Sequence, residues 1–237
     1  MADRTEEEQL EAVKNWVKEN GMSLVLGITL ALGGVFGYQA WQTSVRETGE
    51  EASALYDDLV ATVVVNQGQE LGEEQVSTAR FLADQLKSDY QDTTYGHFAA
   101  MFMSRVAIEQ GDLERAEAEL KWALDHDVDT SLAHIVRPRL AAVLLAQGNP
   151  EGALALLEGI DAGAYTSSYE EVKGDIFLEL GREDAAREAY QKAIDTQVEE
   201  TNKPILDMKR HALAKPETVI PDDPVGDDGQ ISDVEVE

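Results

Sequence analysis

The apolar stretch GMSLVLGITLALGGVFGYQAW at residues 21–41 constrains the fold of this chain most strongly, because it interrupts a sequence rich in acidic residues. No charged residue occurs in residues 20–45. At about 1.5 Å of rise per residue, a helix over 22–41 spans roughly 30 Å, which matches the hydrocarbon core of a bilayer. The stretch therefore predicts one membrane-spanning helix over 21–41.

A buried helix of a soluble domain and a cleaved signal peptide are the two alternatives to a membrane anchor. Trp16 on one side and Tyr38 and Trp41 on the other stand at the two headgroup levels that amphipathic aromatic rings prefer, which a buried helix does not account for. A signal peptide has a basic start and a small-x-small cleavage site, whereas acidic residues 6–8 precede this stretch. We therefore favour an uncleaved anchor.

Small residues give the predicted anchor a smooth face. Gly27, Ala31 and Gly34 fall at positions i, i+4 and i+7, and Gly33 with Gly37 forms a GxxxG motif, which lets a second membrane helix approach closely. Glycine is also common in membrane helices that have no partner. A helix contact through Gly27, Gly33, Gly34 and Gly37 is therefore one of two open alternatives.

The basic residues near the two ends of the stretch predict its orientation. Arg4, Lys14 and Lys18 precede it, and only Arg46 follows within about 20 residues. By the positive-inside rule the N-terminal segment, residues 1–20, lies in the cytoplasm and the C-terminal part lies across the membrane. The reverse orientation, with a cytoplasm-facing adaptor or assembly factor, is the alternative.

The overall composition narrows the class of protein. The formal net charge of the 237 residues is -28, which argues against direct binding to nucleic acid because phosphates would be repelled. There is no cysteine, which excludes disulfides, thiolate metal sites and a cysteine nucleophile.

Three similar phrases in the second half indicate a helical repeat. GDLERAEAELKWAL begins at Gly111, GNPEGALALLEGI at Gly148 and GREDAAREAYQKAI at Gly181, so their glycines lie 37 and 33 residues apart. This spacing is close to the period of about 34 residues of tetratricopeptide repeats. In each phrase an alanine follows the glycine after five residues and a large side chain after nine: Ala116, Ala153 and Ala186, and Leu120, Leu157 and Tyr190.

The repeat predicts a first helix before each glycine, over 95–110, 131–147 and 167–180, and a second helix after it. Each glycine can adopt the left-handed conformation that ends the first helix. Asn149 is a suitable N-cap for a second helix, and Pro150 fits its first position.

Further helices are expected on both sides of the repeats. Apolar residues recur at helical spacing over 52–63 and 76–86, which indicates an atypical capping pair, and 205–213 could close the stack. Residues 216–237 hold eight acids and no base, so we expect a disordered tail over 215–237. The predicted fold is all-α: one N-terminal transmembrane helix followed by a tetratricopeptide-like α-solenoid over 49–214.

No motif for catalysis, cofactor binding or metal binding stands out. DHDVD at 125–129 begins like a calcium loop, but Thr130 replaces the glycine at position six and Val136 replaces the glutamate at position twelve. The histidines show no metal-ligand spacing: His97, His126, His134 and His211. We therefore expect no enzyme, and an anchored hydrolase with an unrecognised pair of carboxylates is a distant alternative.

The N-terminal phrase QLEAVKNWVKENG at 9–21, followed by a glycine-rich span and then a tetratricopeptide-like domain, resembles the YfgM-type ancillary subunits of the bacterial Sec translocon. TYG at 94–96, RLA at 139–141 and KGDIFLELG at 173–181 support the resemblance. It implies a single-pass protein of the bacterial inner membrane, without a cofactor, whose repeat domain faces the periplasm. It further implies an association with SecYEG and the chaperone PpiD, in support of the biogenesis of secreted or outer-membrane proteins.

The repeat register predicts an apolar strip on the inner wall of the first helices. Its members are Met101, Ile108, Ile135, Leu145 and Leu178. We expect this strip to contact a partner or a translocating client. The alternative is that these side chains pack between neighbouring helices, since stacked repeats bury much of both faces.

Overall fold

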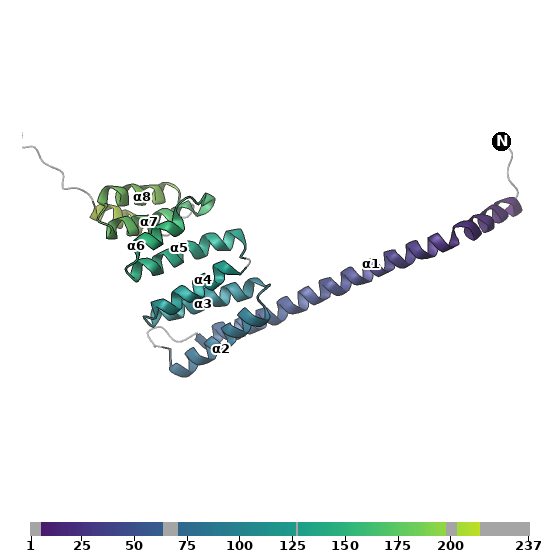
Figure 1. Cartoon of the computed structure of the whole chain (residues 1–237), viewed down its shortest axis with the longest axis horizontal. Coiled ribbons are helices and arrows are strands. Elements are labelled where there is room, and N and C mark those ends of the chain that lie inside the picture. Colours follow the sequence, from purple (N-terminus) through teal and green to yellow (C-terminus); the bar gives the residue numbers. More distant parts are fainter. Residues whose placement is uncertain (1–5, 64–70, 127, 198–202, 214–237) are drawn as a thin grey trace, which may run out of the picture. The chain divides into compact units, whose positions relative to one another are not determined.

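A computed structural model describes residues 6–63, 71–126, 128–197 and 203–213 (Figure 1). These residues form no strand, in agreement with the predicted all-α class. Their helices are α1 (Glu6–Val63), α2 (Glu73–Asp89), α3 (Thr94–Glu109), α4 (Leu113–Asp125), α5 (Thr130–Ala146), α6 (Pro150–Leu157), the short 3-10 helix η1 (Gly163–Tyr165), α7 (Thr166–Glu179), α8 (Glu183–Asp195) and α9 (Lys203–Ala212). The tail predicted over 215–237 lies outside the described residues.

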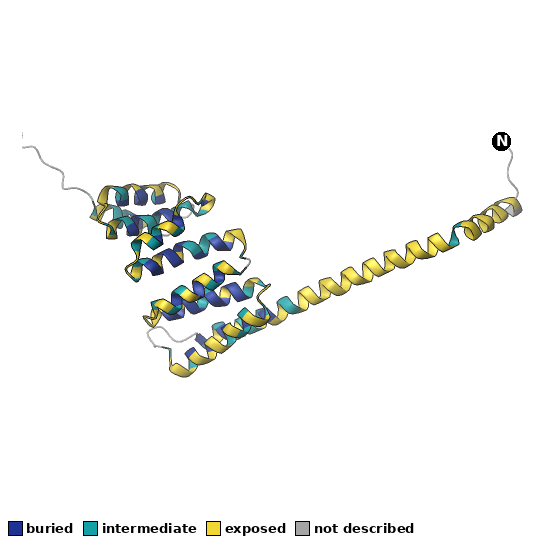
Figure 2. Cartoon of the chain, viewed as in Figure 1, coloured by how far each residue is buried: buried dark blue, intermediate teal, exposed yellow. Residues whose placement is uncertain are grey.

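Helix α1 joins the predicted membrane span to the repeat domain without a break. It is 58 residues long, so its length is about 87 Å. Its most apolar 18-residue window has a mean hydropathy of 1.7 and no residue buried within the protein, which distinguishes it from the core helix of a soluble domain (Figure 2). Near its C-terminal end, by contrast, Ala52, Leu59 and Val63 are buried.

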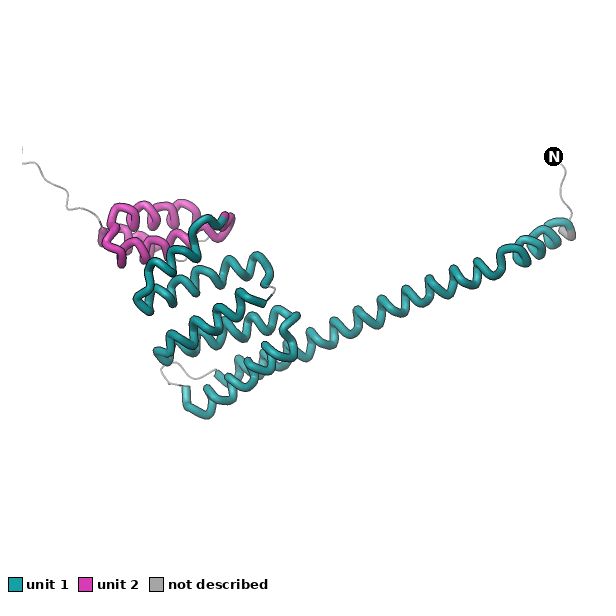
Figure 3. The backbone as a smooth tube through the Cα atoms, viewed as in Figure 1, with its two compact units in different colours: residues 1–160 teal, residues 161–237 magenta. Residues whose placement is uncertain are grey.

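The chain divides into two compact units, residues 1–160 and 161–237 (Figure 3). In the first unit each helix packs against the next one along the chain, from α1 to α6, and α1 also contacts α3. In the second unit α8 packs against both α7 and α9. Packing between sequence neighbours is the pattern expected for a solenoid of helical repeats.

The turns between paired helices confirm the role expected for the three repeat glycines. Gly111, Gly148 and Gly181 have φ values of 76°, 80° and 69°, the left-handed region that a side chain disfavours. Directly after two of them the next helix is capped: the side chain of Asp112 accepts from the amide of Arg115, and that of Asn149 from the amide of Gly152. The turn between the two helices of each pair therefore lies at the predicted position. Helices α3, α5 and α7 begin and end within one residue of the predicted bounds.

Small residues allow the paired helices to lie close together. The repeat alanines are fully buried, and so are the large side chains four positions later: Ala116, Ala153, Ala186, Leu120, Leu157 and Tyr190. On α7, Gly174 faces the Tyr190 ring so closely that a Cβ atom built on it would overlap the ring. Glycine at this position is therefore a packing requirement of the α7–α8 pair.

The helices at the two ends of the repeats also pack as predicted. Ala52 and Leu59 of α1 join Ala79 and Leu86 of α2 in one core cluster, which continues to Met103 of α3. In the second unit Leu206 of α9 is fully buried in a cluster with α8. The atypical first pair and the closing helix are thus part of the folded units.

Two groups of ionic contacts, around Glu170 and around Lys209, link the helices of the second unit. Glu170, only 7% exposed, accepts from Lys173 at 3.0 Å and from Lys192 of α8 at 2.9 Å. Burial by itself would raise the pKa of Glu170, but the hydrogen bonds from Lys192 and Lys173 outweigh it and hold the pKa below its usual value. Lys209 likewise ties α9 to α7, with Nζ 2.8 Å from an oxygen of Asp175.

We predict that Gly174→Ala lowers the free energy of unfolding of the second unit by about 1 to 3 kcal/mol, because the added methyl group must displace the Tyr190 ring. The matched control is Gly49→Ala in α1, where a Cβ meets no atom within 4 Å and helix propensity improves. Thermal unfolding of the full chain measures both. Equal stability of the two variants would contradict the packing.

We predict that Glu170→Gln lowers stability by about 2 kcal/mol at pH 7, since two charge-assisted hydrogen bonds lose their anion. Because the pKa of Glu170 is depressed by folding, its contribution is present above the unfolded-state pKa and is lost as pH falls through the folded-state value. The difference from the parent chain should therefore shrink below about pH 4. Glu188→Gln, an exposed control on α8, should change stability by less than about 0.5 kcal/mol.

Candidate functional site

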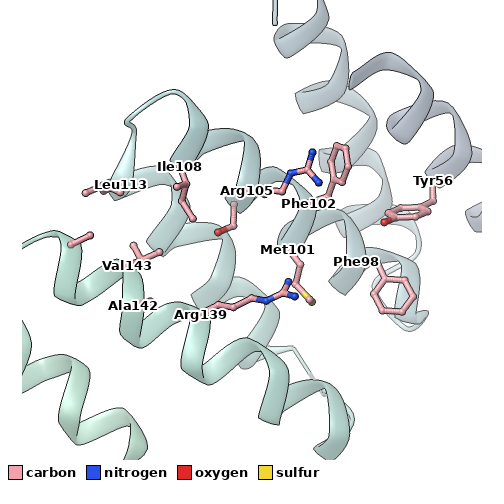
Figure 4. Close-up of a pocket in the computed structure, with 12 residues that line it drawn as sticks. Tyr56, Phe98, Met101, Phe102, Arg105, Ile108, Leu113, Arg139, Ala142 and Val143 are labelled. Carbon is pink, nitrogen blue, oxygen red and sulfur yellow. The ribbon is translucent and has the colours of Figure 1, made fainter. Parts of the chain in front are cut away.

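The first unit contains a groove of about 520 Å³ between its first helices (Figure 4). Helix α3 provides one wall, α5 provides the facing wall, and α1 and α4 each add one side chain. The lining residues are Tyr56, Phe98, Met101, Phe102, Ser104, Arg105, Ile108, Leu113, Arg139, Ala142, Val143 and Ala146. Most of them are apolar, so the groove is suited to binding apolar side chains of another molecule.

Aromatic residues form one end of the groove. The ring centroids of Tyr56 and Phe98 lie 6.0 Å apart, and Tyr95 meets Phe98 edge to face at 6.2 Å. These distances and tilts are favourable for aromatic pairs. The end of the groove is therefore a preformed aromatic surface, and Phe98 remains 37% exposed within it.

The other end is aliphatic. Figure 4 shows Ile108, Leu113 and Val143 together, on the opposite side of Met101 from the aromatic residues. Ile108 is 46% exposed, which is high for a large apolar side chain next to a core. An apolar ligand would cover both ends at once.

The groove contains two of the five residues predicted as an inner-wall strip. Met101 and Ile108 line it, whereas Ile135 and Leu145 lie half-buried on α5 outside it. Leu178 belongs to the second unit, where it is 44% exposed on α7. The role of all five in partner binding stays a prediction.

Most of the groove was not predicted from the sequence. On α3 the lining residues Phe98, Met101, Phe102, Arg105 and Ile108 recur at helical spacing, opposite the buried face of the same helix. That pattern could have been found from the sequence. The contribution of Tyr56 and Arg139 could not have been found from the sequence, because it depends on the relative positions of α1, α3 and α5.

The glycines of the predicted anchor lie on the exposed part of α1. Gly27, Gly33, Gly34 and Gly37 have no atom within 4 Å of a Cβ built on them, so this part of the helix is free of contacts within the described protein. Their contact with a partner helix stays a prediction.

Buried charges in the described residues serve packing contacts. Glu119 of the first unit pairs with Lys87 at 2.8 Å and with Arg115 at 3.4 Å, and Glu170 of the second unit pairs with two lysines. The described residues contain no group of three metal-ligand side chains, and Asp127 of the calcium-like sequence lies outside them. His97 is buried, with Nε2 2.5 Å from the carbonyl oxygen of His126.

Comparison with known proteins agrees with the repeat fold. Residues 14–215 match the family described as a tetratricopeptide repeat-like domain. An ancillary SecYEG translocon subunit of Haemophilus influenzae is 32% identical over 79% of this chain and 88% of its own length. Proteins of the same name from Escherichia coli and Neisseria gonorrhoeae are 26% and 25% identical, over 97% and 100% of their lengths and 88% and 90% of this chain.

No solved structure matches the chain. The region that matches the family begins within the N-terminal part of α1, before the apolar span, and continues beyond α9, so it includes the predicted anchor and helices α2 to α9. The chain therefore belongs to the tetratricopeptide repeat-like family that these ancillary SecYEG translocon subunits represent.

Proposed function

We propose that this chain is a non-enzymatic scaffold of the bacterial inner membrane that associates with the SecYEG translocon through its anchor and its repeat domain. The observation that carries the proposal is α1, which joins an exposed apolar span to a folded repeat unit with an accessible apolar groove. The relatives named as ancillary SecYEG translocon subunits support it. An apolar binding surface beside a membrane is what a protein needs to meet chains that emerge from a translocon.

The continuity of α1 supports a position of the groove close to the bilayer. Ala52, the first buried residue of the repeat unit, lies eleven helical positions after Trp41, at the end of the predicted span. As a continuous helix they extend about 16 Å. The repeat unit is therefore held within about one domain diameter of the membrane surface, and the groove is available to segments that have just crossed it.

We assign the N-terminal residues 1–20 to the cytoplasm, 21–41 to the membrane and the repeat domain over 49–214 to the periplasm. The excess of basic residues before the span supports this orientation. In the periplasm the groove serves a partner such as a PpiD-type chaperone, or the secreted and outer-membrane clients themselves. Gly27, Gly33, Gly34 and Gly37 form the surface of the anchor on which a translocon helix packs.

The orientation predicts the accessibility of single cysteines, which the natural chain lacks. Glu11→Cys and Ser77→Cys replace exposed residues of α1 and α2 on opposite sides of the span. In intact cells, a maleimide that crosses only the outer membrane should label Ser77→Cys and leave Glu11→Cys unlabelled until the cells are lysed.

Labelling of Glu11→Cys alone would reverse the topology, and the chain would then be a cytoplasm-facing adaptor. A shortened soluble fragment that carries the Ser77→Cys label would show that the span is cleaved. Either result would contradict the proposed orientation.

The groove's part in the association can be tested by crosslinking in native membranes. We predict that Met101→Gln combined with Ile108→Gln reduces crosslinks to the translocon or its chaperone by about fivefold or more, because polar side chains would be desolvated in the contact. The control is Phe81→Gln, which changes a 68% exposed ring on α2 outside the groove. Unchanged crosslinking, with thermal unfolding also unchanged, would remove the groove from the interface.

A further inference from the structure

The charges of the groove differ in sign from those of the chain as a whole. The protein has 47 acidic and 19 basic residues. The charged residues that line the groove are nevertheless two arginines, Arg105 on α3 and Arg139 on α5, with no acidic residue among the lining side chains. In a chain with 47 acidic and 19 basic residues, charged side chains that only kept this apolar surface soluble would be mostly acidic.

Neither arginine is neutralised by a buried partner. Arg139 is exposed and forms no ion pair within the described ranges of the chain. Arg105 contacts Glu109 at 3.1 Å, but the two side chains are 65% and 52% exposed, and such surface pairs contribute little. The guanidinium of Arg105 also lies over the Phe102 ring, 5.5 Å from its centroid, which is a cation–π contact.

The two cations lie in the middle of the groove. Figure 4 shows the Arg139 side chain close to Met101 and the Arg105 side chain beside Phe102, both between Tyr56 and Phe98 at one end and Ile108, Leu113 and Val143 at the other. A ligand that covers both apolar ends must therefore place its negative charge within its length. This arrangement favours a carboxylate on a side chain over the carboxylate at the end of a chain.

We propose that this groove binds an apolar polypeptide segment that carries an internal aspartate or glutamate, whose carboxylate pairs with Arg139 and Arg105 while flanking apolar side chains cover the two ends of the groove. Guanidinium groups bind carboxylates through parallel N–H donors, so the pairing adds direction as well as energy. The inference rests on the proposed role of the groove as a binding surface, and it adds the chemistry of the bound segment.

The dimensions of the groove set the length of that segment. From Phe98 to Ile108 the α3 wall runs ten residues, or about 15 Å. This distance accommodates about five extended residues or three turns of a helix. The bound segment is therefore short, with apolar residues on both sides of one acidic residue.

The charge of Arg105 acts on a neighbouring group of the groove, Tyr56. Burial raises the pKa of the Tyr56 hydroxyl, and the positive charge of Arg105 acts in the opposite direction. Asp57 adds a smaller contribution in the same direction as burial, so the pKa of Tyr56 stays above its ordinary value.

The test uses the full chain in nanodiscs, with empty nanodiscs as the blank, and fluorescent peptides of about nine residues, of which the first two have both ends capped. One peptide has glutamate at its centre between leucines and phenylalanines, and the second has glutamine there. A third has the glutamine centre and a free C-terminal carboxylate. We expect the glutamate peptide to bind about tenfold more tightly than the glutamine peptide, and this preference to shrink at high salt.

Variants assign the preference to the arginines. Arg139→Gln should abolish most of the tenfold difference, Arg139→Lys should retain part of it, and Arg80→Gln, an exposed arginine of α2 outside the groove, should leave it intact. Thermal unfolding of each variant shows that the first unit remains folded. Affinity of the glutamine peptide should be unchanged in Arg139→Gln, because the apolar ends are unaltered.

Three results would overturn the inference. Equal affinity for the glutamate and glutamine peptides would show that the groove is only apolar. A preference for the peptide with the free C-terminus would show that the arginines bind a terminal carboxylate. Peptide binding that occurs only after deletion of residues 216–237 would show that the acidic C-terminal segment of the chain itself occupies the groove. No translocon is present in this assay, so none of these results tests the proposed association with the translocon. The crosslinking experiment described above tests that association separately.

Discussion

The close contact between a small residue on one helix and a large residue on its partner is the interaction on which the structure depends. In α7 and α8 this contact joins Gly174 and Tyr190, and in each of the three repeat pairs the repeat alanine of the second helix is fully buried. Such contacts fix the distance within each pair. They also use only one face of each first helix, so another face of α3 and α5 is left for a groove.

The position of α4 explains why that groove exists. Helix α4 packs against both α3 and α5, with Ala116, Leu120 and Ala123 fully buried. On another side of α3, Phe98, Met101 and Ile108 line the space between α3 and α5, where Phe98 and Ile108 remain 37% and 46% exposed. Their exposure is therefore a consequence of the repeat geometry, and its cost is acceptable where a ligand covers them.

The sequence was sufficient to predict the local structure, because turns and helix pairs depend on neighbouring residues. Gly148, Asn149 and Pro150 specify the end of one helix and the start of the next within three positions. The continuity of α1 was not predicted, because residues 42–51 follow neither an apolar nor an amphipathic pattern and contain Gly49, yet no residue there stops a helix. The groove was predicted only in part, since Met101 and Ile108 follow from repeat register whereas Tyr56 and Arg139 meet them through packing of distant segments.

The acidic residues of the chain and the two arginines of the groove act over different distances. The net charge of -28 repels any strongly acidic protein at long range, but salt screens exposed charges beyond about 8 Å at physiological ionic strength. Arg105 and Arg139 act at contact distance, where apolar neighbours exclude part of the water and strengthen the attraction. A segment with one acidic residue among apolar ones is repelled little by the screened surface charge and gains the pairing at contact distance, whereas a densely acidic segment is repelled more strongly once it comes within the screening length. The combination therefore selects for isolated acidic residues in apolar surroundings more sharply than either feature would alone.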